Sequence, residues 1–198
     1  MVRTDLGRHT MDSGSKTRER VCPWWLVYFL YNPLRSVVHN PERILGGHVR
    51  PGHTAMDVGC GPGYFTLPMA RLVGQAGQVI AVDLQPRMLD ILRRRAERAG
   101  LLARIRLHQC SADRLGVQTQ VDFALAFAMV HEVPDPHALL GEIATLLNPE
   151  ARFLLAEPRA HVTPSAFNRT LEIARTVGLQ PCAEPPIAMC RAVLLARS

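Results

Sequence analysis

From residue 54 onward, short apolar runs alternate with segments of helical spacing, and this alternation limits the chain to a small group of folds. Apolar runs of this length, bounded by turn residues, are typical of buried strands. A strand that is followed by a helix and then by another strand favours parallel pairing, with helices on both faces of the sheet. The alternation therefore predicts an α/β domain with a doubly wound, mostly parallel sheet.

The expected strands are residues 54–58, 79–82, 105–108, 123–127 and 153–156, and the expected helices are residues 65–73, 87–99, 137–147 and 165–177. The end of the chain breaks this rhythm, because strand-like runs at 179–189 and 192–195 follow each other with no helical segment between them. Strands joined without a crossover helix pair antiparallel. We therefore expect a seven-stranded sheet with a C-terminal antiparallel hairpin at its edge, and Gly178 at the end of the last helix.

The N-terminal part of the chain divides into two segments. Residues 1–20 are polar and aperiodic, which predicts a disordered extension. In residues 21–47, the pairs Cys22-Pro23, Asn32-Pro33 and Asn40-Pro41 recur at similar intervals, and Asn before Pro matches a helix N-cap followed by the first helical position. We expect three short helices there, and a single domain over residues 21–198 to which they belong.

Composition excludes several classes of protein. The 198 residues are 47% hydrophobic and 20% charged, as in a globular domain, with a net charge of +6. No apolar run approaches the roughly 20 residues that span a bilayer, and Pro23 with the adjacent tryptophans argues against a secretory signal. The five cysteines form no CxxC pair, so we expect reduced thiols, no metal site and a cytoplasmic protein.

A glycine-rich turn between the first strand and the first helix carries the strongest functional signal. Residues 57–63 read Asp-Val-Gly-Cys-Gly-Pro-Gly, and such glycines let the backbone turn tightly and approach a ligand. Asp83 ends the next strand, where its carboxylate can accept hydrogen bonds from two ribose hydroxyls. The dinucleotide pattern GxGxxG is not met, because Tyr64 stands at its third glycine, and the Walker phosphate-binding motif is absent.

The pattern D-x-G-x-G-x-G resembles motif I of the class I S-adenosylmethionine (SAM) dependent methyltransferases. The resemblance covers about residues 45–197. Residues 121–136 are similar to the fourth-strand motif of the branch that includes the ubiquinone and menaquinone C-methyltransferases, and residues 152–158 to its fifth strand. The resemblance implies a Rossmann-like fold with an N-terminal helical lid, SAM as methyl donor, S-adenosylhomocysteine as product, and a small-molecule acceptor.

The resemblance also assigns residues to the cofactor. Ser111-Ala112-Asp113 falls where the family contacts the adenine ring, with Asp113 able to accept from the exocyclic amine. The expected cofactor contacts are Asp57, Gly59, Cys60, Gly61, Gly63, Tyr64, Asp83, Leu84, Ala112, Asp113 and Ala126.

Titratable residues after the fourth and fifth strands are the candidates for chemistry, because ligands of such sheets bind at the carboxyl ends of the strands. We expect His131 to be a base or orienting group for an acceptor OH, NH or SH, or else to cap the loop before the next helix. Glu132 binds a cationic acceptor or caps that helix. Glu157 faces the acceptor or is an exposed strand-end carboxylate.

An aromatic stretch near the N-terminus is the candidate acceptor lid, through Trp24, Trp25, Tyr28 and Tyr31. Packing in the core, and contact of residues 24–31 with a membrane surface, are the alternatives. Cys22 lies beside this stretch, where a thiol would suit metalloid or thiol chemistry.

Two other functions compete with a small-molecule methyltransferase. The basic chain ends favour RNA or protein as acceptor, but residues 126–129 read Ala-Phe-Ala-Met in place of the motif used for amino groups of planar bases, so a nucleic-acid partner is not expected. A catalytically idle SAM-binding regulator would show a broken cofactor motif, whereas the glycines and acids are intact. The sequence says nothing of the oligomeric state.

Overall fold

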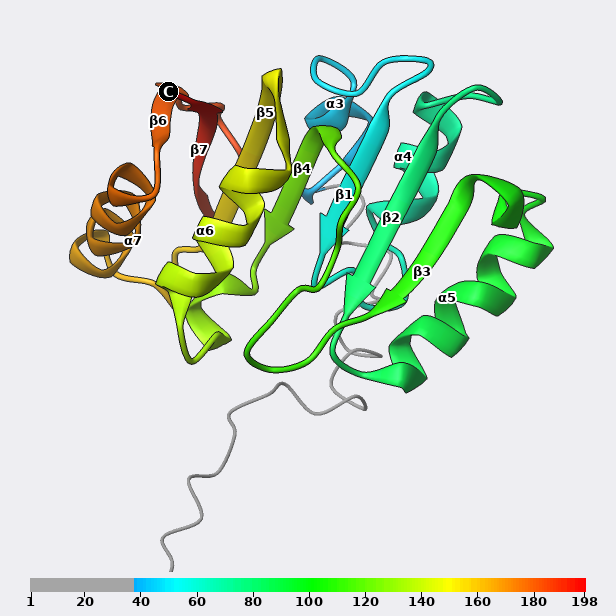
Figure 1. The fold of residues 1–198 in the computed structure, drawn as a ribbon, viewed down its shortest axis with the longest axis horizontal. Coiled ribbons are helices and arrows are strands. Elements are labelled where there is room, and N and C mark those ends of the chain that lie inside the picture. The colour runs from blue at the N-terminus through cyan, green and yellow to red at the C-terminus, as the bar shows by residue number, and fades with distance from the viewer. Residues whose placement is uncertain (1–37) are drawn as a thin grey trace, which may run out of the picture.

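The structure is a computed structural model that describes residues 38–198, and its centre is a seven-stranded sheet (Figure 1). The strand order is β3-β2-β1-β4-β5-β7-β6. The strands are β1 (Thr54–Val58), β2 (Gln78–Asp83), β3 (Ile105–Gln109), β4 (Val121–Phe127), β5 (Leu147–Pro158), β6 (Leu179–Ala183) and β7 (Cys190–Arg197). The first five strands pair parallel, and β7 pairs antiparallel with both β5 and β6, so the doubly wound sheet with its C-terminal hairpin is confirmed.

One expected strand is shorter in the structure. The run 179–189 was expected to be extended throughout, but β6 ends at Ala183 and residues 184–189 form a loop. Pro185 and Pro186 lie just beyond that end, and proline has no N–H to donate to a neighbouring strand. The hairpin therefore has a long connection, and residues 184–189 form part of the wall of a cavity.

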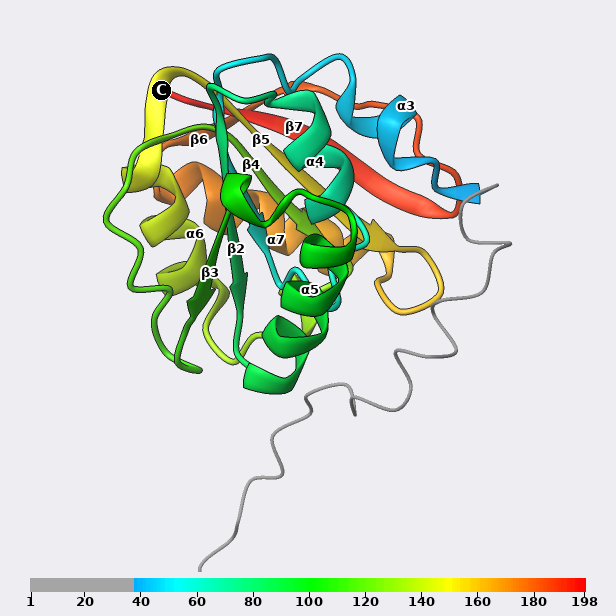
Figure 2. The same cartoon turned by 90° about the vertical axis from the view of Figure 1, so that its right-hand side faces the viewer.

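Helices cover both faces of the sheet, as Figure 2 shows when the sheet is seen along its edge. The helices are α3 (Pro41–Leu45), α4 (Thr66–Leu72), α5 (Pro86–Arg98), α6 (Pro136–Leu146) and α7 (Pro164–Thr176), with 3-10 turns η1 (Leu102–Arg104) and η2 (Val130–Glu132). Buried residues of α3, α4 and α5 form one apolar layer against the sheet, and those of α6 and α7 form the other. The central strands are buried on both faces, which explains their nearly continuous apolar sequences.

Three helices begin in the same way. Asn40, Asp135 and Thr163 each accept a hydrogen bond from a backbone N–H in the first turn, and a proline follows each of them. The helix expected at Asn40-Pro41 is therefore present as α3. The other two short helices, the extension 1–20, the aromatic lid and Cys22 lie outside the described residues.

The architecture brings the ends of β1 to β5 to the same edge of the sheet, because these strands are parallel. Residues 110–120 connect β3 to β4 without a helix, so this edge is bordered by a loop there.

No helix within residues 38–198 is long and apolar enough to cross a membrane.

Candidate active site

The glycine turn after β1 has a backbone that only glycine adopts readily. Gly59, Gly61 and Gly63 have φ angles of 69°, 52° and 87°. A Cβ atom on Gly63 would lie 2.3 Å from Leu92 Cδ1 of α5, so the buried Leu92 side chain would have to move to make room for any other residue. The turn thus starts α4 while it keeps the backbone close to the end of β2.

Asp83 at the end of β2 is held by the backbone of that turn. Its Oδ2 accepts a hydrogen bond from the Gly61 N–H at 2.8 Å, and its Oδ1 accepts one from the Gln85 N–H at 2.8 Å. Burial raises the pKa of Asp83, and the backbone hydrogen bonds oppose that rise. These hydrogen bonds fix the orientation of the Asp83 carboxylate beside the glycine turn.

A cavity of about 310 Å³ lies at this edge of the sheet. Of the residues expected to contact the cofactor, those on its wall are Asp57, Gly59, Cys60, Gly61, Tyr64, Asp83, Leu84, Ala112 and Asp113. Gly63 shapes the turn without lining the cavity. Ala126 does not line the cavity, because its side chain is fully buried in the sheet, where it pairs with Val58 and Leu155. The cavity is reached one residue later, at Phe127 and Ala128.

The cavity is strongly acidic although the protein is basic. Its lining includes six carboxylates and one arginine, namely Asp57, Asp83, Asp113, Glu132, Asp135, Glu142 and Arg114. The remaining wall is largely apolar, with Phe65 packed on Phe127 at a ring-centroid distance of 4.6 Å. Such a site favours a ligand that has both a positive charge and apolar surface.

Ser111 belongs to the segment expected at the adenine ring, and it donates to Asp113 Oδ1 at 2.7 Å; this hydrogen bond is the main reason that the pKa of Asp113 is lowered. Sequence reasoning missed another residue of the cavity wall, Glu142. Glu142 could not have been found, because it reaches the loop after β3 from α6, where it accepts from the N–H groups of Leu115 (3.0 Å) and Gly116 (3.1 Å).

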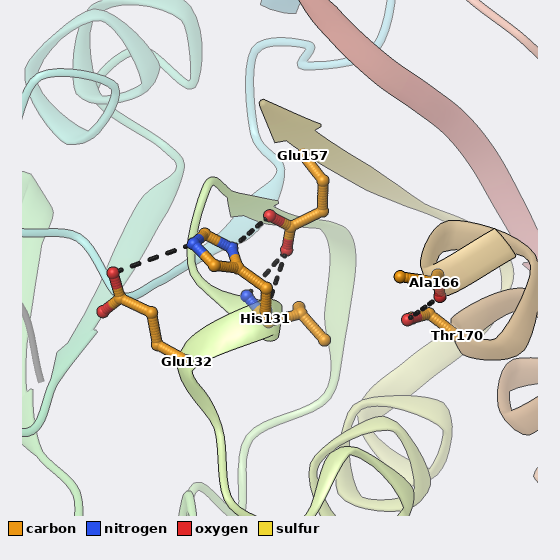
Figure 3. Close-up of polar contacts among 6 residues, drawn as sticks. His131, Glu132, Glu157, Ala166 and Thr170 are labelled. Atoms are coloured by element: carbon orange, nitrogen blue, oxygen red, sulfur yellow. Dashed lines mark hydrogen bonds and ion pairs between the residues drawn. The ribbon is translucent and has the colours of Figure 1, made fainter. Parts of the chain in front are cut away.

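His131 forms a pair with Glu157 beside the cavity (Figure 3). The two residues come from η2 and the end of β5, and His131 Nδ1 lies 2.6 Å from Glu157 Oε2. This hydrogen bond raises the pKa of His131, as do the charges of Glu157 and Glu132, while burial opposes the rise. Because an ionised carboxylate can only accept, the Nδ1 atom carries the proton and donates.

Glu157 differs from both of its expected roles. Its side chain is only 2% exposed, so the exposed carboxylate was a wrong expectation. Its other oxygen accepts from the backbone N–H groups of Val130 (2.8 Å) and His131 (3.3 Å), and it does not line the cavity, so it holds η2 and the imidazole in place instead of facing an acceptor.

Glu132 and His131 are not helix caps. Asp135 caps α6 through its side chain, which accepts from the Ala138 N–H at 3.0 Å. Glu132 instead lines the cavity, and its Oε1 lies 3.8 Å from His131 Nε2. His131 itself does not line the cavity, but its ring lies next to Glu132, which does.

The described cysteines do not form a reactive cluster. Burial raises the pKa of Cys60 far above its usual range, and that of Cys110 to about 11, with the charge of Asp83 adding to both. Both thiols are therefore protonated at neutral pH. Within residues 38–198, no group of three or more His, Cys, Asp or Glu side chains is arranged to hold a metal ion.

Comparisons with known proteins agree with this geometry. Residues 55–150 match the family model described as "Methyltransferase domain". A "Ubiquinone biosynthesis O-methyltransferase" of Xanthomonas axonopodis pv. citri is 31% identical over 150 residues, which cover 73% of this chain and 59% of that protein. The chain therefore spans less than two thirds of the length of the curated relatives that it matches first.

Solved structures share the fold. A SAM dependent methyltransferase from Aquifex aeolicus has a TM-score of 0.81 at 20% identity, over 90% of this chain and all of that chain. The [4+2]-cyclase SpnF has a TM-score of 0.65 at 21% identity, over 77% of this chain and 61% of that chain. Since the second name is that of a cyclase, the fold by itself does not decide the reaction.

Proposed function

Because this chain belongs to the class I SAM-dependent methyltransferases, we propose that it transfers a methyl group from SAM to a hydroxyl group of a small-molecule acceptor. The observation that carries the proposal is the acidic cavity at the glycine turn. SAM has a sulfonium and an ammonium group, and a cavity with six carboxylates and one arginine favours such cations.

The residues at the glycine turn fit this cofactor. Asp83 keeps lone pairs that can accept from ribose hydroxyls, and the turn brings backbone N–H groups close without side chains in the way. Asp113 and Ser111 lie on the loop after β3, where an adenine ring would be bound. When bound, SAM supplies an activated methyl group on sulfur, ready for in-line displacement.

The protein's part in such a reaction is mainly alignment of the acceptor with the methyl group, which contributes up to roughly 7 to 11 kcal/mol in well-oriented systems. We assign the acceptor's proton to His131. Glu157 fixes the proton on Nδ1, so Nε2 of the neutral imidazole is available as the base. Glu132 Oε1 lies 3.8 Å from Nε2 on the cavity side, and its negative charge favours the protonated imidazole that forms when Nε2 takes up the proton.

One observation supports a hydroxylated acceptor. The relatives named as O-methyltransferases are about 30% identical to this chain. The cytoplasmic location and the lid formed by Trp24, Trp25, Tyr28 and Tyr31 remain part of the proposal.

The test uses methyl-labelled SAM with a host extract separated into small-molecule, lipid, RNA and protein fractions. Label in a small molecule, at oxygen by mass spectrometry, is expected, whereas label in RNA or protein would replace the proposed acceptor. Label in the lipid fraction would support a quinone-like acceptor at a membrane surface. The variant Asp83→Ala is the negative control. SAM binding without transfer in any fraction would contradict the proposed activity and favour a regulator.

A further inference from the structure

A second cavity lies on the C-terminal side of the sheet and is distinct from the cofactor cavity. It is an open groove of about 680 Å³ between the first turns of α7 and the loop 184–189. The two cavities share no lining residue. The residues assigned above to methyl transfer do not line this groove.

Two arginines give the groove its charge. Arg159 follows β5 and Arg191 is the second residue of β7, whereas Glu184 is the one carboxylate on its wall. Within residues 38–198 neither arginine forms an ion pair, and the Nη1 atom of Arg191 is buried with no hydrogen-bond partner. A buried donor without a partner is costly, and more so when it belongs to a charged group.

Arg159 is placed by the backbone next to Arg191. Its Nε donates to the Cys190 carbonyl oxygen at 3.0 Å, and its own N–H donates to the Met189 carbonyl oxygen at 2.9 Å. This leaves the terminal nitrogens of an exposed guanidinium for a ligand. The two arginines thus approach the groove from neighbouring strand ends, and Arg159 is held in position by the backbone of β7 and the loop before it.

The loop that closes the groove has a strained backbone. Met189 has a φ of 58° and is 68% exposed, although non-glycine residues rarely adopt this conformation. Residues held in this region are strained, and they cluster at active sites and ligand sites. The strain here brings the Met189 carbonyl to Arg159 and so shapes the arginine side of the groove.

The rest of the wall is mainly apolar. Phe167 and Ile187 are buried on its floor, Leu171 and two prolines extend it, and Asn168 adds an exposed amide. A ligand that fits all of these groups has an anionic end for the arginines and an apolar body.

We propose that this groove binds a small molecule through a carboxylate or phosphate group, with Arg191 and Arg159 as its partners. The inference goes beyond the proposed methyl transfer and does not depend on it. In the sheet, Arg191 pairs with Glu157, which holds His131, so a ligand in the groove lies one strand from the proposed base. The anionic group belongs either to the methyl acceptor or to a separate molecule.

The test measures binding of inorganic phosphate and of benzoate by calorimetry at constant ionic strength. Wild-type protein is expected to bind at least one of them, and Arg191→Gln and Arg159→Gln each to weaken that binding by about tenfold or more, since a hydrogen bond to a charged group contributes about 1.5 to 3 kcal/mol. The matched control is Arg175→Gln, an exposed arginine in the last turn of α7, which is expected to bind as wild type does. Unchanged SAM binding by each variant shows that it is folded.

Two results would overturn the proposal: no binding of either probe by the wild type, or the same affinity in both groove variants as in the wild type. Arg159 is exposed, so its variant keeps the test decisive even where Arg191→Gln fails to fold. Where a probe binds, its effect on the labelled-methyl assay identifies the source. Inhibition that is competitive with the acceptor assigns the anionic group to the acceptor, and unaffected transfer assigns it to a separate molecule.

Discussion

The carboxylate of Asp83 is buried and accepts hydrogen bonds from two backbone N–H groups, and burial raises its pKa. Replacing it with alanine removes both the acceptor for ribose hydroxyls and the charge that favours a cationic ligand. We expect Asp83→Ala to weaken SAM binding by about 1 to 3 kcal/mol, which is roughly 5- to 150-fold in Kd. Calorimetry checks this, with Asp90→Asn on the exposed face of α5 as the control. Equal affinity in a folded Asp83→Ala protein would refute the ribose assignment.

His131 should give the reaction a defined pH dependence. Only the neutral imidazole accepts a proton, and Glu157 raises the pKa of His131 above its ordinary value of 6.5, so activity should rise as pH increases through that raised pKa. Glu157→Gln removes the carboxylate and leaves the burial that lowers the pKa. We therefore expect the acidic limb of the pH–rate profile to move to lower pH in Glu157→Gln. A limb at the same pH in wild type and variant would show that His131 is not the group that titrates.

The same pair makes a pH-dependent contribution to stability. A histidine whose pKa is higher in the folded protein binds its proton more tightly there, so the contribution is fully present below about pH 6.5. It is lost as pH rises through the raised folded value. The free energy of unfolding of wild type should therefore exceed that of Glu157→Gln by more at pH 5.5 than at pH 8.5, as measured by denaturant titration. A difference that grows with pH would contradict the assigned direction of the pKa.

At the scale of elements, the packing of the glycine turn against α5 can be tested with matched alanines. Gly63 and Gly100 have φ angles of 87° and 66°, but only at Gly63 would a Cβ meet a neighbour, Leu92 Cδ1 at 2.3 Å. Both substitutions strain the backbone, by about 1 to 3 kcal/mol. Overpacking adds about 1 to 3 kcal/mol at Gly63 alone, so Gly63→Ala should lower the free energy of unfolding more than Gly100→Ala. If both variants lose the same free energy of unfolding, Leu92 of α5 moves aside without a cost in stability.

The loop between β3 and β4 depends on a side chain from α6. Glu142 accepts from the backbone N–H groups of Leu115 and Gly116, and this anchors a loop that has no helix of its own. Glu142→Ala should speed amide hydrogen exchange at these two positions and weaken SAM binding, because Ser111 and Asp113 lie on the same loop. The control is Glu172→Ala on the exposed face of α7. Unaltered exchange in Glu142→Ala would mean that the loop is held by other contacts.

At the scale of the whole molecule, charge is distributed unevenly. The chain has a net charge of +6, yet the cofactor cavity is lined by six carboxylates and one arginine, and the second groove by two arginines and one glutamate. Overall charge therefore says little about what either site binds. The fold separates the two sites: the acidic cavity lies at the carboxyl ends of β1 to β4, and the basic groove lies beside β5 and β7.

Cofactor binding should be visible in global stability. A ligand at 100 times its Kd stabilises the folded state by about 2.7 kcal/mol. For a domain of this size, that raises Tm by roughly 5 to 10 °C. Thermal unfolding with and without SAM checks this, and Asp83→Ala at the same SAM concentration should show a smaller rise. No rise in the wild type at millimolar SAM would contradict the assignment of the cavity.

The sequence alone determined the features that arise from local patterns. Strand and helix order follow from apolar periodicity, and the N-cap at Asn40 follows from a capping residue before proline. The glycine turn and Asp83 could be identified because their positions follow from the spacing along one β-α-β unit. Each of these depends on residues that are close in the chain.

Only the tertiary structure decided which distant side chains meet. Glu157 and His131 are 26 residues apart, and their contact depends on the end of β5 lying beside the end of β4. Sheet register buried Ala126 and set Arg191 opposite Glu157, and the packing of α6 brought Glu142 to a loop 27 residues away. Such contacts are made across neighbouring strands and helices, where sequence spacing is no guide. This is why the sequence named Glu157 without its contact to His131 and predicted neither the role of Glu142 nor the second groove.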